Sequence, residues 1–435
     1  MLKRAFQLMV LCAGATLAAL LLPNASNFAL VLGQTPRQER AALRPADASA
    51  ETRKTIPIER APLRVIKDSK SSFSAVAVDV ARDEIILQDE SLEQIAVYNR
   101  LDNTPPQAAM TEPKRVIGGP KTNIAMNCGI YVDPVSGDIY SVNGDTNNWM
   151  SVFSREAKGD VAANRALRTP HRTFGVTVDE EAQELFLTIN HAPAVVVYRK
   201  MAQGYEAPLR ILEGDRTQLG DVQGIALDTK NQLMYVANRG AVSRSKNNIG
   251  WARAPVSVKD GVRIWDIPVQ KESWRNFVPG SGAFSPPSIT VYPLKASGDT
   301  PPLRVIQGSL TKLNWPAHIS VDVEHQELYV TGTVTDEILI FRTTANGSAA
   351  PIRVLKGPRT GLRNPHGVYV DVKNDEIVVA NFGNHAATVY RRTASGDTPP
   401  IRTIRAAPPD TPAVMFGNIG ALDYDTKRDE ILVPN

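Results

Sequence analysis

Residues 364–404 read NPHGVYVDVKNDEIVVANFGNHAATVYRRTASGDTPPIRTI, and this stretch predicts four short β-strands. GVYVD (367–371), EIVVAN (376–381), ATVYRR (387–392) and PIRTI (400–404) are rich in the β-branched and aromatic residues that pack well on a pleated surface. VKND (372–375) and ASGDTPP (394–400) carry the Asp, Asn, Gly and Pro that favour tight turns. The stretch therefore predicts one small antiparallel sheet.

Similar sequence motifs recur along the chain. ASGDTPPLRVI (296–306), ANGSAAPIRVL (345–355) and ASGDTPPIRTI (394–404) begin 49 residues apart. The aspartate that closes the first strand recurs with spacings of 54, 46, 49, 94, 49 and 54, at Asp79, Asp133, Asp179, Asp228, Asp322, Asp371 and Asp425. The spacing of 94 is one period plus an insertion. A tight-turn role is predicted for each of these aspartates.

This period predicts an all-β fold, a seven-bladed β-propeller, with six blades as the alternative. A four-stranded unit cannot bury both faces alone, whereas radial stacking covers them and leaves only short edges. The last unit has only two predicted strands, in residues 420–425 and 430–435. We expect KTIPIER (54–60) and APLRVIK (61–67) to complete that blade, so that strands from both chain ends close the ring.

NPHGVYVD followed by ANFGNHAATVY resembles the NHL repeat, including the pair Asn384 and His385. The other units lack the Asn-His step. The resemblance implies an NHL-like propeller, in a broad group of binding proteins with a few lactone-cleaving or lyase enzymes. It therefore does not choose between binding and catalysis.

Composition narrows the function further. The 435 residues are 43% hydrophobic and carry a formal net charge of +4, which is less positive than a nucleic-acid-binding protein of this size usually is. The two cysteines, Cys12 and Cys128, cannot form a disulfide framework or a cysteine-rich zinc site. We expect no nucleic-acid partner.

Near the start of the chain, Lys3 and Arg4 precede an apolar run to Leu22. This pattern indicates a signal peptide or uncleaved signal anchor over residues 1–32. Residues 33–54 are polar and predict a flexible linker, and residues 55–435 form the propeller with an inserted loop at 240–287. We expect an extracytoplasmic protein, periplasmic or secreted. We expect a monomer that meets a membrane only through an uncleaved N-terminal anchor.

In a propeller, the loop before each first strand and the loop after each second strand open on one mouth of the central channel. His318 and His366 stand just before first strands, and four amides stand at the ends of second strands: Asn143, Asn190, Asn238 and Asn381. Their functional interpretation is a polar ligand site that can hold a divalent cation, or, with His318 or His366 as general base, a catalytic site. The alternative is structural, because asparagine tolerates turn geometry and bonds backbone groups.

The inserted loop carries three tryptophans, Trp251, Trp265 and Trp274, and seven basic residues against three acidic ones. Aromatic and arginine enrichment is typical of contact surfaces. Because the loop joins a second strand to a third, we expect it at the same mouth, with Trp251 and Trp265 as ligand-binding residues. The alternative is that the tryptophans pack the loop onto the propeller. DGVRIWDI (260–267) predicts an added hairpin.

Three hypotheses follow. The first is a binding module for a partner protein or small polar ligand at the mouth. The second is a metal-assisted lactone hydrolase or lyase that uses a histidine base in the same mouth. The third is a scaffold of the cell envelope without a small-molecule site.

Overall fold

The computed structural model describes residues 70–144, 147–190, 192–242, 256–265, 283–413, 423–425 and 430–432. The chain divides into two units, Met1–Arg64 and Val65–Asn435. The first unit lies outside the described residues, and with it the predicted leader and linker. No helix among the described residues is both long enough and apolar enough to cross a bilayer.

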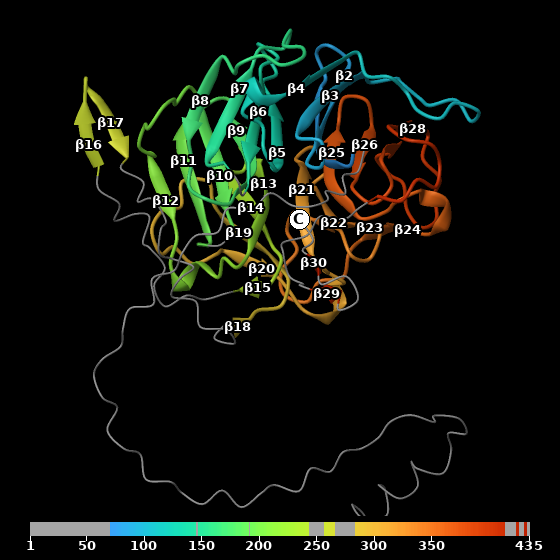
Figure 1. Cartoon of the computed structure of the whole chain (residues 1–435). Helices are drawn as coiled ribbons and strands as arrows, with labels where there is room; N and C mark the ends of the chain where they lie inside the picture. Colours follow the sequence, from blue (N-terminus) through green and yellow to red (C-terminus); the bar gives the residue numbers. More distant parts are fainter. Residues whose placement is uncertain are drawn as a thin grey trace, which may run out of the picture. The chain divides into compact units, whose positions relative to one another are not determined.

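The described part of the second unit contains six four-stranded antiparallel sheets, and we call them blades 1 to 6 in chain order (Figure 1). Blade 1 contains β1 (Phe73–Asp79), β2 (Glu84–Asp89), β3 (Gln94–Asn99) and β4 (Arg115–Gly118). Blade 2 contains β5 (Asn127–Val132), β6 (Ile139–Asn143), β7 (Trp149–Phe153) and β8 (Arg165–Arg168). Blade 3 contains β9 (Thr173–Asp179), β10 (Glu184–Ile189), β11 (Ala194–Arg199) and β12 (Arg210–Leu212).

The second half of the unit follows the same plan. Blade 4 contains β13 (Val222–Asp228), β14 (Leu233–Asn238), β19 (Ser288–Pro293) and β20 (Arg304–Ile306). Blade 5 contains β21 (Pro316–Asp322), β22 (Glu327–Gly332), β23 (Glu337–Arg342) and β24 (Arg353–Lys356). Blade 6 contains β25 (Pro365–Asp371), β26 (Glu376–Asn381), β27 (Ala386–Arg391) and β28 (Arg402–Arg405). Short 3-10 helices follow the fourth strands of blades 1, 3, 4 and 5: η1 (Pro120–Thr122), η2 (Asp215–Thr217), η4 (Ser309–Thr311) and η5 (Pro358–Thr360).

The core lies between blades, because both faces of each sheet are apolar. Tyr329 and Ile340 of blade 5 share one buried cluster with Val379 and Tyr390 of blade 6. The first strands β1, β5, β9, β13, β21 and β25 lie next to one another in that order. They line the central channel.

The repeated ASGDTPP turns join each blade to the one before it. Asp397 of blade 6 accepts a hydrogen bond from the backbone N–H of Arg359 in η5 at 2.7 Å, and Gly396 forms a parallel bridge with Leu355 of blade 5. Asp299 of blade 4 accepts in the same way from Arg216 in η2, also at 2.7 Å. The repeated turn motif of the sequence therefore forms the contact between neighbouring blades.

A turn of blade 1 forms the corresponding contact with blade 6. The backbone N–H of Thr104 donates to the Thr403 carbonyl at 2.8 Å, and Arg405 donates to the Ala108 carbonyl at 2.8 Å. β1 also lies against β25, and Figure 1 shows the blue strands of blade 1 beside the orange and red strands of blade 6. Blade 6 is thus followed directly by blade 1.

The prediction of seven blades was wrong, and the alternative of six is the one that the structure shows. The seventh repeated aspartate, Asp425, belongs to a hairpin of β29 (Asp423–Asp425) and β30 (Glu430–Leu432), which pair with each other and with no other described strand. The seventh blade was predicted on the expectation that strands from residues 54–67 would complete this hairpin. Residues 56–66, which were expected to complete it, lie outside the described residues, so closure through the two chain ends stays a prediction.

The insertion separates the second and third strands of blade 4. β15 (Ala241–Val242) pairs with β18 (Ala283–Phe284) at its base. Between them, β16 (Val256–Lys259) and β17 (Val262–Trp265) form the hairpin that DGVRIWDI predicted. β17 continues onto blade 3 through a bridge between Ile264 and Glu206.

Candidate functional site

One end of the channel, which we call the mouth, carries the residues that precede each first strand and follow each second strand. Backbones approach closely here. A Cβ on Gly175 would lie 2.7 Å from the Gln223 carbonyl oxygen of blade 4, and one on Gly367 would lie 2.9 Å from Ala75 Cα of blade 1. Glycine is needed at these positions because the neighbouring first strand occupies the space that a Cβ would fill.

Aromatic and imidazole rings meet across the mouth. The ring centre of Phe174 in blade 3 lies 6.0 Å from that of His318 in blade 5 and 5.7 Å from that of His366 in blade 6. The two imidazole centres are 5.9 Å apart, and Phe382 lies 6.0 Å from His366 on its other side. Blades 3 and 6 stand opposite each other, so these rings occupy the middle of the channel.

Backbone carbonyls orient both imidazoles. Nδ1 of His366 lies 2.9 Å from the Ser74 carbonyl oxygen, and His318 bonds the backbone of Cys128. A carbonyl can only accept, so the proton sits on Nδ1 and each Nε2 carries a lone pair. Nε2 of His318 is buried and has no hydrogen-bond partner among the described residues.

Both imidazoles are neutral at neutral pH. Burial lowers the pKa of His318 to about 4, although its bond to Cys128 acts in the opposite direction. Burial, together with the positive charge that His318 would carry, lowers the pKa of His366 to about 3. The mouth therefore holds two uncharged nitrogen acceptors.

An ion pair and an aromatic ring border the histidines. Arg239 Nε lies 3.4 Å from Asp221 Oδ2, and its guanidinium stacks 4.2 Å from the ring centre of Trp315. Burial lowers the pKa of Arg239 and raises that of Asp221, so the charged form of each group is disfavoured by desolvation. Gln223 donates to Asp221 at 3.5 Å, and its Oε1 is buried without a partner in the described part of the chain.

Sequence reasoning missed this rim, although a fixed position marks it. The residue seven places before the repeated aspartate has a left-handed backbone in five blades: Met126 (φ 44°), Arg172 (φ 63°), Asp221 (φ 50°), Trp315 (φ 53°) and Asn364 (φ 46°). Its carbonyl accepts a bond from the loop after the second strand, as in Arg239 N–H to Asp221 O at 3.1 Å. The backbone turn is structural, and its side chains differ from blade to blade at the mouth.

Comparison with known proteins identifies the repeat. A sequence model of the NHL repeat matches residues 362–389, which contain β25, β26 and most of β27. The chain is an NHL-repeat-like β-propeller protein. Among solved structures, hydrazine synthase of Kuenenia stuttgartiensis is similar at 12% identity with a TM-score of 0.48, over 78% of this chain and 100% of that one. No curated protein matches the chain.

Three of the four predicted amide ligands of this NHL-like propeller hold its own loops. Asn143, Asn238 and Asn381 are at most 1% exposed, and the Oδ1 of each accepts the N–H of the residue eighteen places earlier. Their Nδ2 atoms donate to a backbone carbonyl or to a threonine hydroxyl. Asn190 is 7% exposed and bonds Asp221. The structural alternative therefore describes the first three, whose polar atoms are already used.

Trp265 lies away from the mouth. It is 1% exposed and packs on Tyr198, with ring centres 6.4 Å apart, at the end of blade 3 where Leu185 pairs with Tyr198 and the repeated Asp179 lies nearby. Its expected place at the mouth is corrected, because the hairpin folds back along blade 3. Trp251 lies outside the described residues.

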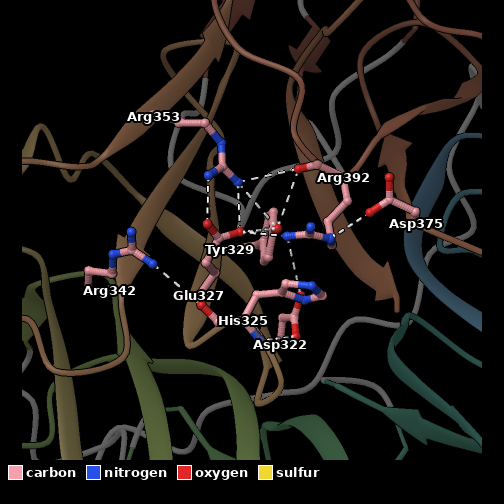
Figure 2. Close-up of polar contacts among 8 residues, drawn as sticks. All are labelled: Asp322, His325, Glu327, Tyr329, Arg342, Arg353, Asp375 and Arg392. Atoms are coloured by element: carbon pink, nitrogen blue, oxygen red, sulfur yellow. Dashed lines mark hydrogen bonds and ion pairs between the residues drawn. The ribbon is translucent and has the colours of Figure 1, made fainter. Parts of the chain in front are cut away.

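The repeated aspartates occupy the opposite end of each first strand and hold turns. Asp79 Oδ1 accepts the N–H groups of Ala81 and Arg82, each at 3.1 Å, and Asp322 Oδ1 accepts that of His325 at 2.9 Å. Figure 2 shows the surrounding network, in which Arg392 of blade 6 pairs with Glu327 of blade 5 at 3.1 Å and with Asp375 at 2.7 Å. These carboxylates have structural partners.

The described residues contain no group of three or more His, Cys, Asp or Glu side chains that could hold a metal ion. His318 and His366 thus have no third protein ligand of these types within the described part of the chain. The predicted divalent cation stays a prediction.

Proposed function

We propose that this NHL-like propeller is a binding module whose mouth takes a hydrogen-bond-donating group of a partner protein or of a small polar ligand. The family resemblance supports a protein-binding or scaffold role. The ligand and its place at the mouth are our proposal.

The lone pair of His318 Nε2 carries the proposal. A buried acceptor without a partner costs about 1 to 3 kcal/mol, and a bound N–H or O–H group would recover that cost. Gln223 Oε1 is a second buried acceptor in the same state, and its orientation is fixed because Nε2 donates to Asp221. His318 Nε2 and Gln223 Oε1 are both acceptors, so a ligand that satisfies these two atoms offers donors.

The surrounding side chains suit binding. Phe174 is half-buried beside the imidazoles, and Trp315 is 43% exposed with Arg239 stacked on it. Aromatic residues and arginine supply much of the binding energy at protein interfaces. A donor group held between these rings would be desolvated and aligned.

General-base catalysis is supported less well. A base works best when its pKa lies near the working pH, whereas the pKa of His318 is about 4 and that of His366 about 3. Neutral imidazoles this weakly basic accept hydrogen bonds but take a proton poorly. The lactonase or lyase hypothesis is therefore the second candidate.

Nitrogen NMR of the imidazole rings tests the proposal. Saccharides, amines and short peptides are titrated into the protein, and the Nε2 resonances of His318 and His366 should shift while those of His171 and His325 stay fixed. His318→Phe keeps a ring of similar size but removes the acceptor, and it should abolish binding. His325→Phe, at the opposite end of blade 5, is the control. Binding that leaves both mouth rings unchanged, or that survives in His318→Phe, would contradict the proposal.

Export is a separate part of the proposal and rests on the apolar run after Lys3 and Arg4. Fractionation of cells that express the full chain should find it outside the cytoplasm. Deleting residues 1–32 should retain it in the cytoplasm.

A further inference from the structure

A second polar site lies between blades 1 and 2, away from the mouth. It is a groove of about 470 Å³, which we call the basic groove, and its cations are Arg82, Lys114, Arg115, Arg155 and Lys158. Only two carboxylates, Glu84 and Glu156, line it. The groove therefore has an excess of positive charge.

Lys114 departs from the repeat. It directly precedes the arginine that opens the fourth strand, a position occupied in blades 3 to 6 by Leu209, Leu303, Ile352 and Ile401 and in blade 2 by Asn164. The four aliphatic residues are 40% to 56% exposed, so this position does not need a lysine for packing. The fold tolerates leucine here, and the lysine is particular to blade 1.

The carboxylates only partly offset the cations. Glu84 is shared by Lys114 at 2.5 Å and by a two-pronged pair with Arg115 at 2.9 and 3.0 Å. These bonds hold the pKa of Glu84 below its usual value although burial raises it. Glu156 pairs with Arg155 at 2.7 Å but is 74% exposed. Glu84 thus pairs with two cations at once, and Glu156 is exposed to solvent.

Two arginine side chains approach one glycine. A Cβ on Gly137 would lie 3.1 Å from both Arg82 Nη1 and Arg155 Cδ. Arg82 is fixed by Asp79 at 2.9 Å and by the Val135 carbonyl at 2.6 Å. Lys158, which is exposed, completes the rim. The two guanidinium groups and the Lys158 ammonium all carry positive charge, so an anion bound among them would reduce their mutual repulsion.

We propose that the basic groove binds a phosphate group. A phosphate offers two charges and several acceptor oxygens, which suit arginine forks and lysine ammonium groups on different sides of a groove. The group can belong to a soluble phosphorylated molecule or to a lipid headgroup. Both sources present the same chemistry.

Titration calorimetry of the full chain with inorganic phosphate and pyrophosphate tests this site. Lys114→Leu copies the residue of blades 3 and 4, so it should fold normally and weaken binding about fivefold, the loss of one charged contact. Lys114→Leu combined with Leu303→Lys restores the net charge at an equivalent place on blade 4. This double variant should bind as weakly as Lys114→Leu.

Four results separate the outcomes. Saturable phosphate binding that Lys114→Leu weakens supports the site, and His318→Phe should leave it unchanged because the mouth lies elsewhere. Binding restored by Leu303→Lys would show attraction by net charge alone and overturn the proposal. Vesicles of phosphatidylglycerol, compared with phosphatidylcholine, identify a lipid source if they bind where free phosphate does not. Binding of neither would also overturn it.

Discussion

Asp89 ends the second strand of blade 1, where blades 2, 4 and 6 carry asparagine. Its Oδ1 accepts the Ser72 N–H at 3.1 Å, as the asparagines accept from their own loops. It is fully buried, and burial raises its pKa to about 6 despite bonds from the backbone of Ser72, Leu92 and Ser91. The Asp89 carboxylate makes the same hydrogen bond as the asparagine amides, but its ionised form must also be desolvated.

We therefore expect Asp89→Asn to stabilise the protein at neutral pH. The folded-state pKa of Asp89 lies above the unfolded value of 3.8, so ionisation costs stability as the pH rises from 3.8 through 6. The variant should gain about 1 to 3 kcal/mol at pH 7 and nothing near pH 4. Urea unfolding at both pH values measures this. Equal gains at both would show that the effect is not electrostatic.

The mouth histidines should make the protein sensitive to acid. Their folded-state pKa values, about 4 for His318 and about 3 for His366, lie below the unfolded value of 6.5. The unfolded chain binds more protons in this window, so their stabilisation is present above pH 6.5 and is lost as the pH falls toward 4. In His318→Phe, the midpoint of thermal unfolding should fall less between pH 7 and pH 4.5 than in the natural chain. An unchanged slope would contradict the assigned protonation state.

Local residue roles were predictable from the sequence, and distant ones were not. The turn role of Asp322 follows from its own neighbours, since Asp side chains bond the backbone two or three residues on. The meeting of Phe174 with His366 depends on which blades face each other. No local pattern contains that information.

At the scale of elements, the first strands approach one another closely where they cross the mouth. A Cβ on Gly129 would overlap the Phe174 carbonyl oxygen of the next blade. Gly129→Ala must therefore push two strands apart and should cost about 3 kcal/mol. Gly159→Ala is the control, because nothing lies near its Cβ and only its left-handed φ of 73° costs about 1 kcal/mol. Equal losses in guanidinium unfolding would contradict the close approach.

Arg392, which directly follows β27 of blade 6, should contribute more to stability than Arg342, which ends β23 of blade 5. It is 8% exposed and pairs with Glu327 across the blade boundary, whereas Arg342 is exposed and reaches the His325 carbonyl at 3.4 Å (Figure 2). Arg392→Leu should cost about 2 to 3 kcal/mol because it leaves buried carboxylates with fewer partners. Arg342→Leu should change the unfolding free energy by less than about 0.5 kcal/mol. A similar small loss for both would show that the blade contact is not supported by this pair.

The strands and the hairpin 256–265 follow from the sequence, and the place of the hairpin does not. Alternating β-branched residues and turn signals predict each strand without reference to the rest of the chain. Trp265 illustrates the limit. Its burial on Tyr198 depends on the path of the insertion across blade 3, which the position of the loop between two strands leaves open.

At the scale of the whole molecule, the period predicts a propeller but not its blade number. The number of repeats in the sequence gives the number of similar segments. The number of blades depends on which of these segments form four-stranded sheets. The hairpin that contains Asp425 resembles the start of a blade in sequence and is separate from the six sheets in hydrogen bonding. The contact between blades 1 and 6 is the feature that distinguishes six blades from seven.

A cysteine pair across that contact tests the central claim most directly. The Asn103 side chain accepts the Thr403 N–H at 3.1 Å, so Asn103→Cys with Thr403→Cys places two thiols at the boundary of blades 1 and 6. Stacked sheets lie about 10 Å apart, so an inserted seventh sheet would hold these thiols well beyond the reach of a short crosslinker. Six blades predict efficient intramolecular crosslinking by a short bis-maleimide, with the 103–403 linkage found by peptide mass spectrometry. A folded double variant that gives no such linkage would contradict the account.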